Sequence, residues 1–308
     1  MNKELSVVIP VYNGEQTVGL VVEDILKTLD DVLLEIVLVN DGSPDGSGRV
    51  CEELVVKHAP RVKYVELSRN FTEHNAVMAG LLHTSGDYVV EMDDDCQNPA
   101  PEVRLMLDEI RKGFDVVYSY YEKKRHHFLR NLGSWFNDRV ATIMLKKPRD
   151  LYLSSFKVMN RFIVNEMVRC ANPYPYIDGL IFQITTRISK VKVEHKEREH
   201  KRSNYTVSKL VGLWLNMFIN FSILPLRLAT YAGFAMAACG LGLGVFSVVE
   251  RILKPDLPTG FASLIVSILL IGGIQCFLLG MLGEYLGRLF LSVNRKPQFV
   301  VRRKLGWD

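Results

Sequence analysis

Two long uncharged apolar runs in the last third of the chain constrain its fold more than any other feature. Leu228–Val249 and Phe261–Leu282 contain no Asp, Glu, Lys or Arg. Each run is long enough to cross the hydrocarbon core of a bilayer as a helix. The alternative, a pair of buried helices in a soluble core, is rare for two such runs in one chain. Because the segment Glu250–Pro258 between them is short and polar, the sequence predicts a transmembrane helical hairpin.

Basic residues are distributed unequally around this predicted hairpin. The turn carries Arg251 and Lys254, whereas the flanks carry more cations. Lys and Arg accumulate on the cytoplasmic side of membrane proteins, so we expect both ends of the hairpin in the cytoplasm. The chain leads from Met1 directly into an apolar strand, so we expect no signal peptide and a cytoplasmic N-terminal domain. The flanking cations are Arg227, Arg288, Arg295, Lys296, Arg302, Arg303 and Lys304.

A basic and then apolar stretch precedes the hairpin. Residues 196–209 are dense in charge, and Leu210–Leu224 is apolar and carries Trp214 and Phe218. This pattern is typical of an amphipathic helix in the membrane interface, so we expect membrane lipids as partners. The net charge of +4 is too small to indicate nucleic acid. The predicted organisation is a cytoplasmic domain at 1–200, a juxtamembrane segment at 201–226, the hairpin at 227–287 and a cytoplasmic tail at 288–308.

The first two thirds of the chain alternate between short apolar runs and segments with helical spacing. Strands that alternate with helices imply an α/β fold with a mostly parallel sheet and helices on both faces. The predicted strands are Leu5–Pro10, Leu34–Asn40, Val62–Leu67, Asp87–Met92 and Asp115–Tyr120. The predicted helices between them are Val18–Leu29, Gly48–His58, Glu73–His83 and Val103–Lys112.

Polar residues follow the predicted strands at the edge where parallel sheets bind ligands. Asp93, Asp94 and Asp95 follow the fourth strand. Carboxylates at alternate positions of an extended segment can face one cation, and oxygen ligands suit Mg²⁺ or Mn²⁺. Such an ion would neutralise charge on a nucleotide-diphosphate leaving group. The alternative for an acidic run is a solvated loop, but its place at a strand end favours the metal site.

Two further strand ends carry candidate nucleotide contacts. A carboxylate at Asp41 can accept a hydrogen bond from a base or a ribose, although spacing alone favours an Asx turn or helix cap. Pro10 and Tyr12 offer a rigid turn and an aromatic face for a base, whereas a lone Tyr more often serves packing.

Five segments in order resemble family 2 glycosyltransferases of the dolichol-phosphate mannose synthase type. The resemblance is to the bacterial branch with two C-terminal membrane helices, which glycosylates undecaprenyl phosphate and includes transferases for glucose and for 4-deoxy-4-formamido-arabinose. It implies a GT-A (Rossmann-like) catalytic domain, a nucleotide-sugar donor, a divalent metal and inversion at the anomeric carbon. The segments are VVIPVYNGEQTV, LVNDGSPDGS, SRNFTEHNAVMAGL, GDYVVEMDDDCQNP and MLGEYLGRLFLSVNRKPQFVV.

The resemblance also implies roles for single residues. Asp93 and Asp95 match the metal-binding Asp-x-Asp of the family, and Asp95 and Arg198 are the catalytic candidates. Asp41 would hold the uracil or the ribose. The other implied substrate-binding residues are Pro10, Tyr12, Glu15, Asp94, Gln97, Arg125, Arg130, Ser203 and Tyr205.

The chain departs from the family pattern near Phe156. Many relatives carry an Asp just before a strand that reads Phe-Arg-Leu, whereas Ser155 precedes Phe156 here and Asp150 is shifted. No catalytic Asp is therefore assigned. A phosphate monoester has a second pKa of about 6 and is largely dianionic at neutral pH. A lipid phosphate would thus need positioning and charge screening by Arg and Lys rather than a strong base.

Two other features allow more than one interpretation. Pro173–Gly179 is either part of the acceptor or sugar pocket, with Asp178 as a hydroxyl acceptor, or a turn before a helix. His74 is predicted to be structural or a minor donor contact rather than a catalyst.

The sequence as a whole predicts a glycosyltransferase of the inner membrane that moves a sugar from a UDP-sugar to polyprenyl phosphate for cell-envelope glycans. We expect a homo-oligomer, with a tetramer among the candidates. One alternative is a transferase for another lipid or for a polysaccharide. The other is an inactive membrane scaffold that binds nucleotide sugar.

Overall fold

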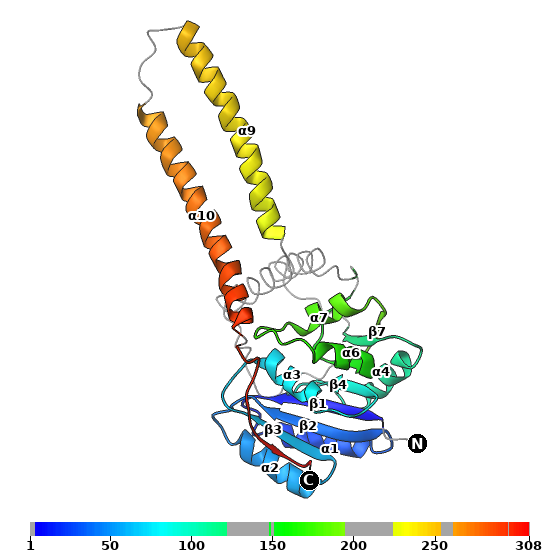
Figure 1. Ribbon diagram of the computed structural model, residues 1–308. Helices are drawn as coiled ribbons and strands as arrows, with labels where there is room; N and C mark the ends of the chain where they lie inside the picture. Colours follow the sequence, from blue (N-terminus) through cyan, green and yellow to red (C-terminus); the bar gives the residue numbers. More distant parts are fainter. Residues whose placement is uncertain are drawn as a thin grey trace. The chain divides into compact units, whose positions relative to one another are not determined.

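The computed structural model describes residues 4–121, 148, 151–194, 224–253, 261–294 and 296–307. The chain forms two compact units. The first comprises Met1–Tyr205 and Arg295–Asp308, and the second comprises Thr206–Asn294. A sheet with helices forms the first unit, and two long helices dominate the second (Figure 1).

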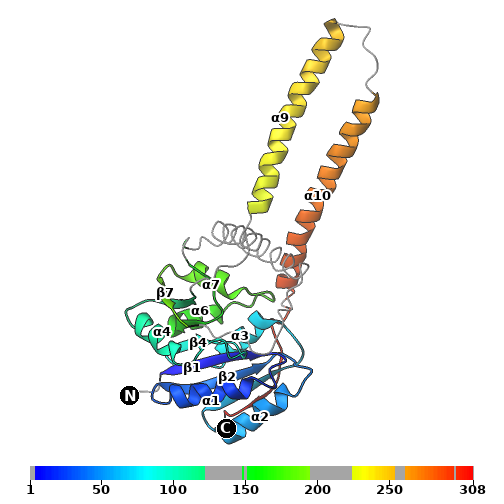
Figure 2. The same cartoon turned by 180° about the vertical axis from the view of Figure 1, so that it is seen from behind.

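An eight-stranded sheet forms the centre of the first unit, in the order β7-β5-β6-β4-β1-β2-β3-β8 (Figures 1 and 2). Strands β4, β1, β2 and β3 are parallel to one another, whereas β6 is antiparallel to β4 and β5, and β8 is antiparallel to β3. The predicted mostly parallel α/β sheet is confirmed. The strands are β1 Leu5–Val11, β2 Leu33–Asn40, β3 Val62–Leu67, β4 Tyr88–Glu91, β5 Val116–Tyr120, β6 Lys157–Asn160, β7 Ile188–Lys192 and β8 Val301–Leu305.

Helices cover both faces of the sheet because successive strand side chains point to opposite sides. In β1, Leu5, Val7 and Ile9 pack in a core cluster with α1, α2 and α4, whereas Val8 packs in a second cluster with α3, α6 and α7. The helices of this unit are α1 Val18–Thr28, α2 Ser47–Lys57, α3 Glu73–Leu82, α4 Glu102–Ile110, α6 Arg161–Met167 and α7 Ile177–Ile184. The two-faced packing expected from the sequence is thus present.

The C-terminal segment adds a strand that the sequence did not predict. Residues 288–308 were expected to form a cytoplasmic tail, but Val301–Leu305 pairs with β3 as the edge strand β8. Arg303 donates hydrogen bonds to Glu66 and Glu52, and the amide of Ser68 donates to the carbonyl of Val300 at 2.9 Å. The end of the chain is therefore part of the sheet domain.

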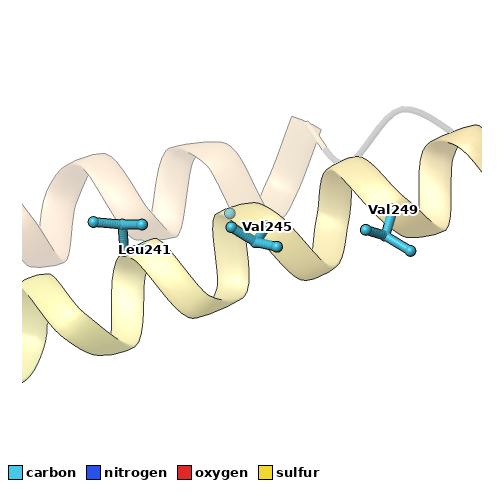
Figure 3. Close-up of a pocket in the computed structure, with 4 residues that line it drawn as sticks. Leu241, Val245 and Val249 are labelled. Carbon is cyan, nitrogen blue, oxygen red and sulfur yellow. The ribbon is translucent and has the colours of Figure 1, made fainter.

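The second unit contains α9 (Leu224–Leu253) and α10 (Phe261–Val293). Ala229–Phe246 and Ile271–Leu291 are apolar and long enough to cross a membrane, as the sequence predicted for this region. The interfacial helix predicted at Leu210–Leu224, within the juxtamembrane segment 201–226, lies up to residue 223 outside the described residues. One face of α9 carries an open apolar hollow (Figure 3), lined by Leu241, Gly244, Val245 and Val249.

Candidate active site

The loops that follow β1 and β2 are joined by hydrogen bonds at the carboxyl edge of the sheet. The amide of Gly14 donates to Ser47 Oγ at 2.9 Å. The Glu15 carboxylate accepts from the amide of Gly46 at 3.2 Å and lies 3.6 Å from the Arg49 guanidinium. Glu15 thus lies at the N-terminus of α2, where the helix dipole favours a negative charge. Its predicted contact with a nucleobase stays a prediction.

Pro10 and Tyr12 occupy the end of β1 as the sequence predicted. Pro10 pairs with Val39 of β2, but the pairing of β1 with β4 already ends at Val8 and Glu91. The strand can therefore accept a residue without an amide hydrogen at this point. The side chain of Tyr12 is 47% exposed, so an aromatic face is available beside the loops.

Asp41 is almost completely buried and ties the end of β2 to the loop before α3. Its Oδ1 accepts a hydrogen bond from the amide of Phe71 at 2.6 Å. Burial raises the pKa of Asp41 to about 6, against the hydrogen bonds from the Phe71 and Thr72 amides, which lower it. Gly42, with φ +64°, permits this approach, because a Cβ there would lie 2.6 Å from the carbonyl carbon of Arg69. Asp41 thus ties two loops together and forms neither the Asx turn nor the helix cap that spacing favoured. A contact with uracil or ribose stays a prediction.

The acidic turn follows β4, where the sequence placed it. The Ser155 hydroxyl donates to Asp93 Oδ2 at 2.6 Å. Asp95 Oδ1 accepts from the amide of Gln97 at 3.1 Å, which closes a short Asx-type turn. The three aspartates are partly exposed as residues, although Asp94 Oδ2 is buried.

Asp94 lies on the β1 side of the same turn. A Cβ added to Gly14 would lie 2.1 Å from Asp94 Oδ2, so the glycine leaves room for this carboxylate. The loops after β1, β2 and β4 therefore meet at one edge of the sheet.

The oxygen donors of the acidic turn fit a hard divalent cation. Within the described ranges, no three His, Cys, Asp or Glu side chains form a complete metal cage. Mg²⁺ is usually held by one or two carboxylates and completed by substrate phosphates and water, so a partial protein site suits it. The candidate ligands Asp93 and Asp95 match that chemistry.

A buried charged cluster, which was not predicted from the sequence, adjoins the acidic turn. Lys157 Nζ lies 3.3 Å from Glu91 Oε2 and 3.1 Å from Asp178 Oδ1, and the Tyr118 hydroxyl donates to Asp178 Oδ1 at 2.8 Å. All four residues are buried. Burial raises the pKa of Glu91 to about 8. Burial alone would lower the pKa of Lys157, but Asp178 and Glu91 raise it above its ordinary value.

The cluster fixes the end of Pro173–Gly179. Helix α7 begins at Ile177, and the Asp178 carboxylate is held by Tyr118 and Lys157. The segment therefore leads into a helix, and its part in an acceptor or sugar pocket stays a prediction. A lysine inside the apolar run of β6 was the available sequence signal for this cluster, because a buried lysine needs an acidic partner.

His74 lies in the first turn of α3 beside this segment. Its ring meets the Tyr176 ring edge-on, with 5.2 Å between centroids. Burial lowers the pKa of His74 to about 4, so the imidazole is neutral at pH 7. Among the described residues, its Nδ1 has no hydrogen-bond partner. The prediction of a structural or minor donor role is not tested by this geometry.

The predicted basic contacts cannot be placed. They lie outside the described residues, together with Asp150, and their roles stay predictions. These candidates are Arg125, Arg130, Arg198, Ser203 and Tyr205.

The mostly parallel sheet and the acidic turn after β4 define a glycosyltransferase-like α/β domain of the GT-A type. Residues 6–168 match the family described as Glycosyl transferase family 2, and residues 224–289 match the GtrB C-terminal hairpin. The chain belongs to glycosyl transferase family 2. It is a glycosyltransferase, and the hairpin match together with the two apolar helices makes it membrane-associated.

Similar proteins cover nearly the whole chain. The undecaprenyl-phosphate 4-deoxy-4-formamido-L-arabinose transferase of Proteus mirabilis is 29% identical, over 98% of this chain and 94% of its own length. The uncharacterized glycosyltransferase YkcC of Bacillus subtilis is 30% identical over the same shares. A solved structure of glucosyl-3-phosphoglycerate synthase from Mycobacterium tuberculosis, with Mn²⁺, uridine diphosphate and phosphoglyceric acid, has a TM-score of 0.51. It is 19% identical, covers 68% of this chain and 74% of its own, and supports the fold alone.

Proposed function

We propose that this chain transfers a sugar from a UDP-sugar to undecaprenyl phosphate, with inversion at the anomeric carbon. The product is a lipid-linked sugar for cell-envelope glycans. The observation that carries the proposal is the acidic turn after β4 in a chain whose relatives, aligned over 98% of it, include transferases named for undecaprenyl phosphate. The hairpin would hold the catalytic domain at the cytoplasmic face of the inner membrane, where a lipid acceptor is present.

Asp93 and Asp95 are the proposed ligands of Mg²⁺ or Mn²⁺, and a bound cation would supply charge neutralisation at the donor diphosphate. Support comes from the oxygen-rich turn and from the Mn²⁺ complex of the mycobacterial synthase, which shares the fold. Asp94 and Gln97 belong to the same turn and are proposed donor contacts.

The loops after β1 and β2 are the proposed nucleotide site. The exposed ring of Tyr12 offers a stacking face for the base, and Pro10 fixes the strand end beneath it. Asp41 and Glu15 lie in the same loops and accept hydrogen bonds from their backbone amides. Because Asp41 already holds the Phe71 and Thr72 amides, its proposed contact uses the remaining lone pairs of the carboxylate.

The lipid phosphate needs no strong base in this proposal, because it is already largely ionised at neutral pH. The position before Phe156 is a serine whose hydroxyl donates to Asp93, so this part of the site offers no proton acceptor there. Cations near the membrane would position the phosphate and screen its repulsion from the donor. The proposed cations are Arg125, Arg130 and Arg198, with Ser203 and Tyr205 as further contacts. We also propose a homo-oligomer.

The test supplies the purified full chain with Mg²⁺, a panel of UDP-sugars and an equimolar mixture of undecaprenyl phosphate and diacylglycerol. Lipid products are identified by mass spectrometry. The proposal predicts a glycosylated undecaprenyl phosphate from at least one donor. Exclusive glycosylation of diacylglycerol, or no glycolipid from any donor, would contradict it.

A further inference from the structure

A cross-strand pair connects β4 and β6 beside the acidic turn, and a second contact follows just beyond the strand ends. In the antiparallel register, Glu91 lies opposite Lys157, and the two side chains form a buried ion pair at 3.3 Å. Asp93 and Ser155 lie two residues further along each segment, and their side chains form the next pair, at 2.6 Å. The hydrogen bond thus continues the connection between the two segments just past the ends of the strands.

Lys157 fixes the backbone that presents Ser155. Its ammonium donates to the main-chain carbonyl of Ser154 at 3.2 Å, in addition to its contacts with Glu91 and Asp178. Lys157 is 2% exposed, and a lysine is held at such depth only when its donors are satisfied. The peptide just before Ser155 is therefore tied to the same ammonium that pairs with β4.

A second set of hydrogen bonds orders the turn from the other side. The Ser119 hydroxyl of β5 donates to the carbonyl of Phe156 at 2.7 Å, and its oxygen lies 2.9 Å from Ser154 Oγ, within hydrogen-bond distance. The amide of Phe156 donates to Ser154 Oγ at 3.2 Å. Residues on both sides of Ser155 are thus held by buried bonds, while Ser155 itself reaches a partly exposed carboxylate.

We propose that Ser155 is a positioning residue, which orients the Asp93 carboxylate for the divalent cation, and that Lys157 fixes Ser155 in turn. This inference rests on the proposed function. A neutral hydroxyl donor orients one carboxylate oxygen and leaves Asp93 its negative charge and its other lone pairs. Partners that orient metal ligands in this way typically contribute about 10- to 100-fold to metal affinity.

A serine that only stabilised its loop would affect unfolding but not metal affinity, so the experiment measures both. The full chain in detergent is titrated with Mn²⁺ in the presence of UDP, and free Mn²⁺ is followed by electron paramagnetic resonance. Ser155→Thr keeps the hydroxyl, and Ser155→Val has the shape of threonine without the hydroxyl. Ser189→Ala is the matched control, because Ser189 Oγ also donates to a carboxylate, Glu109, at 2.6 Å but lies in β7.

We expect Ser155→Val to bind Mn²⁺ about 10- to 100-fold more weakly, and Ser155→Thr and Ser189→Ala to bind close to wild type. Thermal unfolding of the Thr and Val variants should match, which separates metal affinity from stability. Equal Mn²⁺ affinity of the two folded variants would overturn the inference and leave the proposed function intact. Absence of metal and UDP binding in the wild type would overturn both.

Discussion

Each end of the parallel sheet buries a glutamate carboxyl group, but the pKa of that group shifts in opposite directions at the two ends. At the amino end, Glu35 accepts hydrogen bonds from the Ser6 hydroxyl at 2.8 Å, the Ser85 amide at 2.6 Å and Lys63 at 2.6 Å. Burial alone would raise the pKa of Glu35, but these donors lower it below its ordinary value. The carboxylate is therefore stable in its ionised form.

At the carboxyl end, Glu91 shares one cation with a second acid. Lys157 lies between Glu91 and Asp178, and the pKa of Glu91 is raised to about 8 by burial. The aspartates at 93–95, two to four residues further along the chain, add further negative charge. Among the described residues, this edge has more carboxylates than cations close to it.

Backbone strain also differs between the amino and carboxyl ends of the sheet. The non-glycine residues with positive φ in the described part of the chain are Asn13, Thr72 and Cys96, and each follows a strand at its carboxyl end. Such residues persist where the surrounding structure holds them, and they cluster at functional sites. The amino end is thus built for stability, and the carboxyl end keeps excess negative charge and strain where a cationic ligand would act.

The strongest test of this contrast is Asp95→Ala. Loss of a metal ligand should remove several kcal/mol of transition-state stabilisation, so we expect kcat/KM for sugar transfer to fall about 100- to 10,000-fold. The control is Glu35→Gln at the amino end, which should retain transfer. An unchanged kcat/KM in Asp95→Ala would contradict the role of Asp95 as a metal ligand.

The two lysines that pair with buried carboxylates, Lys157 and Lys63, should differ in their effect on stability. Lys157→Met leaves two buried acids without their cation, and we expect the free energy of unfolding to fall by about 3–5 kcal/mol. Lys63→Met should cost about 1–3 kcal/mol, because the Ser6 and Ser85 donors still reach Glu35. Denaturant unfolding in detergent measures both losses, and a larger loss for Lys63→Met would reverse the contrast.

Acid should destabilise the amino end through Glu35. Its folded pKa lies below the ordinary value of 4.5, so the unfolded chain binds more protons as the pH falls below 4.5. The stability from this ionised carboxylate is present above pH 4.5 and is lost as the pH falls through the folded pKa. Glu35→Gln should therefore flatten the acid side of the profile of thermal unfolding against pH. An unchanged acid slope would show that the carboxylate is not held as described.

The smallest expected effect is at Thr72, which has φ 81° and ψ 156°. Glycine adopts this conformation without strain, and the strain is about 1–3 kcal/mol. The greater freedom of glycine in the unfolded chain offsets about 0.5–1 kcal/mol of that gain. Thr72→Gly should thus raise stability by about 1 kcal/mol, whereas Thr72→Ala should not. Equal unfolding temperatures of the two variants would contradict the strain.

The sequence predicted the elements whose pattern is local. The strands β1 to β5 and the helices between them follow from apolar periodicity, and the acidic turn follows from its place after a buried strand. Strand β8 was not predicted, because Val301–Leu305 carries Arg302, Arg303 and Lys304. Its pairing depends on acids such as Glu66, which are far away in the chain. No apolar alternation marks such a charged edge strand.

The candidate site was predicted only in part, for the same reason. Asp93, Asp95 and Tyr12 could be predicted because they come directly after strands. Lys157 and Ser155 reach the site only through the antiparallel pairing of β6 beside β4. A long connection separates these two strands in the chain. The spacing of residues along the sequence cannot reveal which strand a short four-residue run will join.

The central claim is metal-dependent sugar transfer to a lipid phosphate at the carboxyl end of this sheet. Its most direct test follows glycosylated undecaprenyl phosphate with the full chain and one accepted UDP-sugar, before and after removal of metal with EDTA. The account predicts that EDTA abolishes the product, that added Mn²⁺ or Mg²⁺ restores it, and that Asp95→Ala is not restored. Product formation that persists in EDTA, or that Asp95→Ala sustains at the wild-type rate, would contradict it.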